Sequence, residues 1–83
     1  MKIQFTKSEW ELLRDEVGMY TDLVPDAGIV KDENIILVMD YDDWDELNGY
    51  IANVSNHIEN KDHEKILDGI YWRVERRLKE EEK

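Results

Sequence analysis

The sequence predicts an α+β fold in which three helices lie on one face of a small antiparallel sheet of two or three strands. Three observations lead to this prediction. Short apolar runs precede two of the helical stretches, apolar residues recur at helical spacing in three segments, and only a short polar connection separates the last two segments. The predicted order is β-α-β(β)-α-α, and the last two helices should form an antiparallel hairpin.

The first strand and helix are predicted from an alternating stretch that meets a helix start signal. Ile3 to Phe5 alternate apolar and polar, and Thr6-Lys7-Ser8-Glu9 matches the capping box, in which a hydroxyl and a carboxylate satisfy free backbone donors. The helix should end before Pro25, and Asp26-Ala27-Gly28 should form a turn. Two apolar stripes follow the cap, one of Trp10, Leu13, Val17 and Tyr20 and one of Leu12, Met19 and Leu23.

A β-hairpin and a second helix are predicted next. Ile29-Val30 and the run Ile35 to Met39 flank a polar tetrad, although Ile29-Val30 is short enough to be a loop. Asp40 should end the second of these strands and cap a helix. The apolar stripe of that helix has the seven-residue repeat that requires a partner helix. It consists of Trp44, Leu47, Ile51, Val54 and Ile58.

The third helix is predicted to begin at Asp62, a good N-cap residue. Residues 1–78 should form a single domain because 83 residues are too few for two self-supporting cores. The polar tail 79–83 is expected to fray. The broad apolar arc of this helix consists of Ile66, Leu67, Ile70, Tyr71, Val74 and Leu78.

The two strand-to-helix junctions resemble each other. Residues 5–13 can be aligned with residues 39–47, so that a strand end, a cap, an acid, a Trp and a Leu coincide. Trp10 and Trp44 are therefore predicted to be equivalent core anchors, each folded back over the strand that precedes it. Common ancestry and two independent uses of the same junction chemistry are both open.

The composition excludes several classes of protein. The absence of Cys excludes disulfide scaffolds, thiol catalysis and thiolate metal sites, and it favours a reducing compartment. The start of the chain has no apolar signal core, and the longest apolar run, Ile35 to Met39, is far shorter than the roughly 18 residues of a membrane span. A cytoplasmic protein is therefore expected.

The net charge of −10 is concentrated in the middle of the chain. Residues 32–64 carry ten acidic and one basic side chain, whereas residues 65–83 carry five acidic and six basic ones. A negative field of this kind repels phosphate backbones and anionic lipid surfaces. No direct binding to nucleic acid or to a membrane is therefore expected.

Motifs for catalysis or for cofactors are weak. The apolar strand that ends in Asp40-Tyr41-Asp42 resembles the nucleophile strand of haloacid dehalogenase phosphatases, but 83 residues cannot hold the other units that such enzymes need. The same stretch lacks the Gly of a calcium loop. His57 and His63 match no metal-ligand spacing, and no Gly-rich phosphate loop is present. The sequence predicts no enzyme, cofactor, metal site or small-molecule substrate.

Trp72 is the strongest candidate for a functional residue. At 100° per residue it points away from the apolar arc of its helix and onto a basic face. Trp and Arg concentrate binding energy in protein interfaces, and a Gly one turn earlier would leave a notch beside the indole. Alternatively, the first helix or the sheet covers this side and makes Trp72 a core residue. The neighbours on this face are Lys65, Gly69, Arg73, Arg76 and Lys79.

Two alternative functions would explain these surfaces. The first is a non-enzymatic protein-binding or dimerisation domain, in which the Trp72 face and an acidic segment are complementary surfaces and a second copy is the simplest partner. The second is an acidic inhibitor or antitoxin-like protein, which places carboxylates where phosphates would lie and so occupies a nucleic-acid-binding protein. The acidic segment consists of Asp40, Asp42, Asp43, Asp45 and Glu46.

Overall fold

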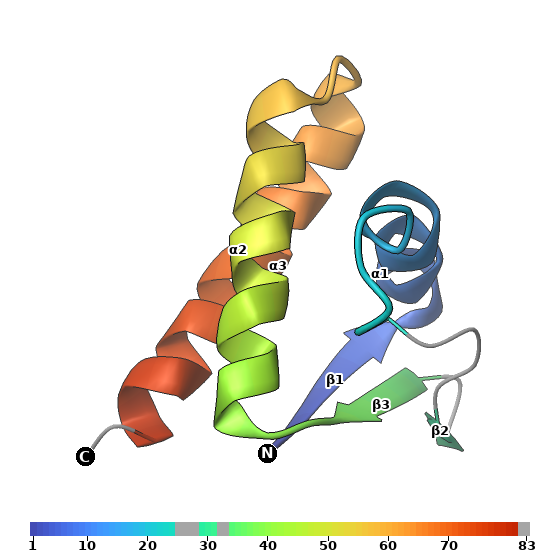
Figure 1. The fold of residues 1–83 in the computed structure, drawn as a ribbon. Helices are drawn as coiled ribbons and strands as arrows, with labels where there is room; N and C mark the ends of the chain where they lie inside the picture. Colours follow the sequence, from blue (N-terminus) through green and yellow to red (C-terminus); the bar gives the residue numbers. More distant parts are fainter. Residues whose placement is uncertain (25–28, 32–33, 82–83) are drawn as a thin grey trace.

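A computed structural model describes residues 1–24, 29–31 and 34–81, and it has the predicted α+β architecture (Figure 1). The predicted break at Pro25 and the turn at residues 26–28 lie outside the described residues. The strands are β1 (Lys2–Thr6), β2 (Ile29–Lys31) and β3 (Asn34–Val38). The helices are α1 (Lys7–Leu12), which continues into the π-helical turn η1 (Leu13–Val17), α2 (Tyr41–His57) and α3 (Lys61–Glu81).

The strands pair in the order β1-β3-β2, and both pairs are antiparallel. The register places Ile3 opposite Leu37 and Phe5 opposite Ile35, and these four residues are buried on the face toward the helices. The short strand that the sequence left open is present, because Val30 pairs with Ile35. Strands β1 and β2 are therefore the two edges of the sheet.

The two strand-to-helix junctions have the same backbone geometry but different caps. Thr6 and Asp40 are the N-cap residues, with φ and ψ of −73° and 163° and of −72° and 163°. At Thr6 the predicted capping box is complete, because its hydroxyl accepts the Glu9 N–H at 3.2 Å and the Glu9 carboxylate accepts the Thr6 N–H at 2.8 Å. Asp40 occupies the predicted N-cap position of α2, but its side chain forms no cap hydrogen bond. The N3 residue of α2 is Asp43, one methylene shorter than the Glu or Gln of a capping box.

The first helix ends earlier than its apolar pattern predicted. In η1 the Gly18 N–H donates to the Leu13 carbonyl oxygen, five residues back, at 2.9 Å. The helix stops at this wide turn, and Met19 and Tyr20, which the pattern assigned to buried stripes, are exposed. The residues that do bury are Trp10, Leu12, Leu13 and Val17.

Both predicted anchors, Trp10 and Trp44, are core residues. The Trp44 indole N–H donates to the Met1 carbonyl oxygen at 3.0 Å, and its ring lies 6.2 Å from the Phe5 ring, centroid to centroid. These contacts join Trp44 to β1 and to the residue before it. Met1 pairs with Met39 through two backbone hydrogen bonds, and this pairing brings the start of α2 beside the start of β1. The packing of each Trp on the strand that precedes it stays a prediction.

Helices α2 and α3 form the predicted antiparallel hairpin, which stands beside α1 and the sheet (Figure 1). Ile66 was predicted to join the buried arc but is exposed, because at 100° per residue it lies roughly 85° from the centre of that arc. No described helix is both long and apolar enough to span a bilayer. The buried seam contains Trp44, Leu47, Ile51 and Val54 from α2 and Leu67, Ile70, Val74 and Leu78 from α3.

The N-terminal end of α3 differs in detail from the prediction. Asn60, and not Asp62, caps the helix, because the Asn60 side-chain oxygen accepts the backbone N–H groups of Asp62 and His63 at 3.0 and 3.2 Å. Asn and Asp are equally good caps, so the chemistry alone could not choose between them. At the other end the helix continues through Lys79 to Glu81.

Candidate functional site

Trp72 lies on the outer side of α3 and is 57% exposed, so it is not a core residue. Helix α1 contacts α3 on another flank, where it meets Arg73 and leaves the indole uncovered. The Tyr71 ring packs edge-to-face against the indole, with the centroids 5.2 Å apart and an interplanar angle of 80°. A large apolar side chain is thus displayed in water on a regular helix.

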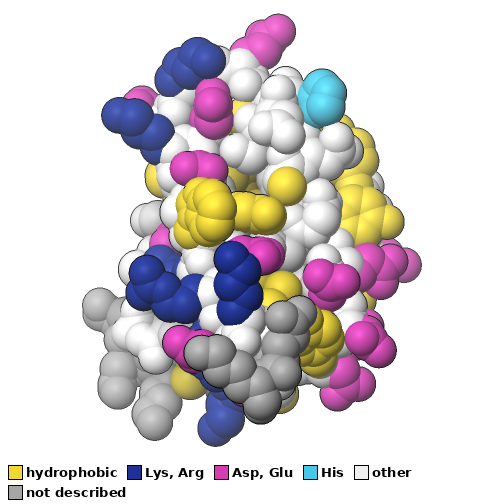
Figure 2. Space-filling view, turned by 90° about the vertical axis from the view of Figure 1, so that its left-hand side faces the viewer, with side chains coloured by type: hydrophobic (Ala, Val, Ile, Leu, Met, Phe, Trp, Pro, Cys, Tyr) yellow, Lys and Arg dark blue, Asp and Glu magenta, His cyan; other side chains and the backbone are white. Residues whose placement is uncertain are grey.

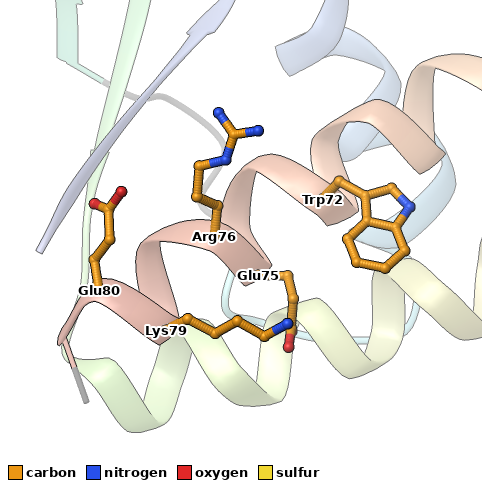
Figure 3. Close-up of a pocket in the computed structure, with 5 residues that line it drawn as sticks. All are labelled: Trp72, Glu75, Arg76, Lys79 and Glu80. Carbon is orange, nitrogen blue, oxygen red and sulfur yellow. The ribbon is translucent and has the colours of Figure 1, made fainter. Parts of the chain in front are cut away.

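The indole separates two shallow hollows. The larger, of about 410 Å³, lies toward the C-terminal end of α3 (Figure 3). In that view Glu75 and Lys79 extend to the same side of the helix as the indole, whereas Arg76 and Glu80 extend to the other side. The smaller hollow, of about 220 Å³, lies between α2 and α3 and is lined by Ala52, Ser55, Asn56, Asp68, Tyr71 and Trp72.

Three exposed cations on the same helix as the indole have no ion-pair partner among the described residues. They are Lys65, Arg76 and Lys79. We call Trp72, these three cations and Asp68 the Trp72 surface. Figure 2 views the molecule from the side of the helical hairpin and shows hydrophobic side chains flanked by Lys and Arg, with some Asp and Glu among them and others along the right edge. The face therefore offers apolar area and both signs of charge.

Arg73 does not belong to the Trp72 surface, although the sequence placed it there. Its guanidinium donates two hydrogen bonds to the Glu9 carboxylate, at 3.0 and 2.8 Å, and one to the Gln4 carbonyl oxygen at 3.1 Å. It also lies 5.6 Å from the centroid of the Phe5 ring. Arg73 therefore ties α3 to the junction between β1 and α1.

Glu9 is the acidic half of this structural pair. Burial raises the pKa of the Glu9 carboxyl, but the hydrogen bond from Arg73, the Thr6 backbone bond and the positive charge of Arg73 outweigh burial and lower the pKa overall. The backbone N–H and C=O groups of the even-numbered residues of β1 point to the free edge of the sheet. This follows because Met1 and Met39 exchange two backbone hydrogen bonds, so the odd-numbered residues are the ones bonded to β3. The pair thus also covers part of an open sheet edge.

The structure forms no ion pair between the acidic segment and the three cations. Asp42, Asp45 and Glu46 are exposed along the first turns of α2, and Asp43 is partly buried. None of them forms an ion pair with a described residue. Both predicted binding surfaces therefore have charged groups that can pair with a partner.

Two polar residues near the site were missed from the sequence. Asn48 is buried in the hairpin, where its side-chain amide donates to the Glu75 carboxylate at 3.3 Å, while its side-chain oxygen is buried with no hydrogen-bond partner among the described residues. Asp68 lines the smaller hollow. Its position one helical turn before Trp72 was the available signal.

The described residues contain no group of three or more His, Asp or Glu side chains that could hold a metal ion. The two His residues are engaged separately: the His57 Nδ1 lies 2.8 Å from the Asn53 carbonyl oxygen, and the His63 Nδ1 lies 3.6 Å from a Glu16 carboxylate oxygen. Comparison with known protein families, curated proteins and solved structures finds no match to the chain. The function is therefore argued from the geometry of the Trp72 surface.

Proposed function

We propose that this chain is a non-enzymatic protein-binding domain that docks its partner on the Trp72 surface. The observation that supports the proposal is an indole that is 57% exposed on a regular helix, beside three cations that lack partners among the described residues. Trp and Arg are the residues that most often dominate the energetics of protein interfaces. Covering the indole would remove a large apolar area from water.

The chemistry of the surface defines its partner. Lys65, Arg76 and Lys79 would be complemented by carboxylates, and the indole by an apolar or cationic side chain. The partner surface should therefore be partly apolar and carry acidic groups. A chain without Cys suits a reducing compartment such as the cytoplasm.

The surface is held rigidly, which favours binding. Ile70 and Val74, on the opposite face of α3, are fully buried, and Arg73 ties the same helix to β1 and α1. A helix fixed in this way loses little conformational freedom when a partner docks. Little of the binding free energy gained at Trp72 is then offset by the loss of conformational entropy.

Site-specific crosslinking tests the proposal. Because the chain has no Cys, Glu80→Cys introduces a unique thiol in the larger hollow that the indole lines, and Glu11→Cys introduces one on the exposed side of α1. Each protein is labelled with a photoactivatable crosslinker and irradiated in an extract of its native cells. We expect protein adducts from position 80, fewer when Trp72→Ala is added, and none from position 11. Identical adducts from both positions, or none from position 80, would contradict the proposal.

A second candidate function is the acidic inhibitor. It is favoured by the exposure of Asp42, Asp45 and Glu46 without ion-pair partners among the described residues. A crosslinker at Glu46→Cys would then capture a nucleic-acid-binding protein, and added DNA would compete with capture. Capture that DNA does not affect would exclude this candidate.

A further inference from the structure

We infer that the partner of the Trp72 surface is a second copy of this chain, in a two-fold symmetric dimer whose α3 helices cross antiparallel at Trp72. This inference rests on the proposed function and specifies its partner. In a symmetric dimer of this type, the same patch of both copies must be complementary to itself. The Trp72 surface meets that condition.

The self-complementarity lies in one row of side chains on α3. Asp68, Trp72 and Arg76 are spaced four residues apart, so they form a single ridge on the helix surface. In the commonest class of helix packing, such ridges of two helices lie side by side. When the helices run antiparallel and cross at Trp72, Asp68 of each copy meets Arg76 of the other. Neither residue has an ion pair with a described residue of its own chain.

The hollow beside Asp68 suits the guanidinium of the second copy. It combines one carboxylate, the Tyr71 and Trp72 rings, and the hydroxyl and amide groups of Ser55 and Asn56. A guanidinium there would pair with Asp68 and lie near an aromatic face, and it would have further hydrogen-bond acceptors. Arg76 lines the other hollow, and because its guanidinium extends to the other side of the helix from the indole in Figure 3, the side chain would turn toward the second copy on association.

Gly69 supplies a second observation. A glycine inside a helix is destabilising relative to Ala, and a Cβ placed at Gly69 would meet nothing within 4 Å in the single chain. The fold of one copy therefore does not require this glycine. Next to Trp72 and Asp68, its missing side chain lets another helix approach closely.

A standard interface buries about 800 Å² on each partner, which is one seventh of the 5632 Å² that the chain exposes. Two terms oppose association. Each copy carries a charge of −10, and Lys65 would face Lys79 of the second copy. Salt near 0.1 M screens these two repulsions beyond a distance of about 10 Å. The proposed ion pairs between Asp68 and Arg76 are shorter than this distance and are therefore screened less.

Charge reversal tests the arrangement. In sedimentation equilibrium at physiological salt, the wild type should dimerise, and Asp68→Arg or Arg76→Asp alone should each raise the dimer Kd at least about tenfold. A mixture of the two variants should restore a heterodimer, with a Kd within about threefold of the wild-type value, because both contacts then join Arg to Asp. Circular dichroism checks that each variant is folded. If a reversal variant does not fold, Asp68→Asn and Arg76→Gln replace the pair, and each should weaken dimerisation.

Glu11→Arg and Lys7→Asp make the same charge changes on the exposed side of α1 and serve as controls. Neither should weaken dimerisation to the same extent. A wild type that is monomeric at every concentration would overturn the inference, as would reversal variants that dimerise normally or do not recover on mixing. A monomer that still yields Trp72-dependent adducts with a different protein would overturn the dimer and leave the proposed function standing.

Discussion

Trp44 and Trp72 show how position decides what the same side chain does. Trp44 is fully buried, and its indole N–H donates to the Met1 carbonyl oxygen, whereas Trp72 is mostly in water. Trp44→Ala should lower the free energy of unfolding by about 3 to 5 kcal/mol. Trp72→Ala should change it by less than about 0.5 kcal/mol. Urea unfolding of dilute protein measures both, and equal losses would contradict these assignments.

Glu9 should make stability depend on pH. Its pKa is lower in the folded protein than in the unfolded chain, so ionised Glu9 stabilises the fold above the ordinary Glu pKa of about 4.3. That contribution is lost as the pH falls from there through the lowered folded-state pKa. Glu9→Gln keeps a residue able to complete the capping box but removes the charge paired with Arg73.

We therefore expect Glu9→Gln to be less stable than the wild type at pH 7 and about equally stable at low pH. Urea unfolding of both proteins at several pH values measures the difference, and the other carboxyl groups, present in both, largely cancel. A difference that stays constant down to pH 3 would rule out the lowered pKa as its cause.

Distance along the chain separates what could be predicted about these residues from what could not. The outward direction of Trp72 follows from the helical spacing of its neighbours, all of which lie in the same segment of the sequence. The role of Arg73 depends on Glu9, which is 64 residues away in the sequence. Periodicity of α3 alone cannot find such a partner.

Among the elements, both strand-to-helix junctions were predictable because cap residues and apolar spacing lie close together in the sequence. The π-helical turn η1 was not, because one extra residue in a turn leaves the preceding pattern of Trp10, Leu13 and Val17 unchanged. The hydrogen bond from the Gly18 N–H to the Leu13 carbonyl oxygen and the exposure of Met19 and Tyr20 reveal it. The Asn60 cap was missed because Asp62 offered the same chemistry two residues later.

Gly18 is required by the end of η1, and Gly49 provides the contrast. A Cβ at residue 18 would lie 2.5 Å from the Arg14 carbonyl oxygen, whereas one at residue 49 would meet nothing within 4 Å. Gly18→Ala should therefore destabilise the fold by about 1 to 3 kcal/mol. Gly49→Ala should stabilise it by up to about 1 kcal/mol. Thermal unfolding compares them, and a stabilising Gly18→Ala would contradict the geometry of this turn.

At the scale of the whole molecule, the net charge of −10 should destabilise the folded chain through like-charge repulsion. Asp42, Asp45 and Glu46 contribute, because they are exposed without ion-pair partners in the described part of the chain. Moderate NaCl, with a screening length near 10 Å at about 0.1 M, should therefore raise the Tm. A Tm that falls with added salt would show that ion pairs such as Arg73 with Glu9 dominate.

The α+β class and the helical hairpin were predictable because they follow from apolar spacing and short connections. The row of Asp68, Trp72 and Arg76 also lies within one helix, but the hollow that would receive the guanidinium of a second copy forms only where α2 packs beside α3. Some residues of the site could therefore be predicted from the sequence, but the hollows beside them could not.

Oxidative footprinting of the unmodified protein tests the central claim, that Trp72 lies in a protein interface. Hydroxyl radicals oxidise exposed side chains, so Met19, 76% exposed, and buried Trp44 are internal references for Trp72 in one chain. Mass spectrometry compares dilute purified protein with the same protein in its native extract. We expect oxidation of Trp72 to fall in the extract while that of Met19 does not. Equal protection of Trp72 and Met19, or no protection of Trp72, would contradict the claim.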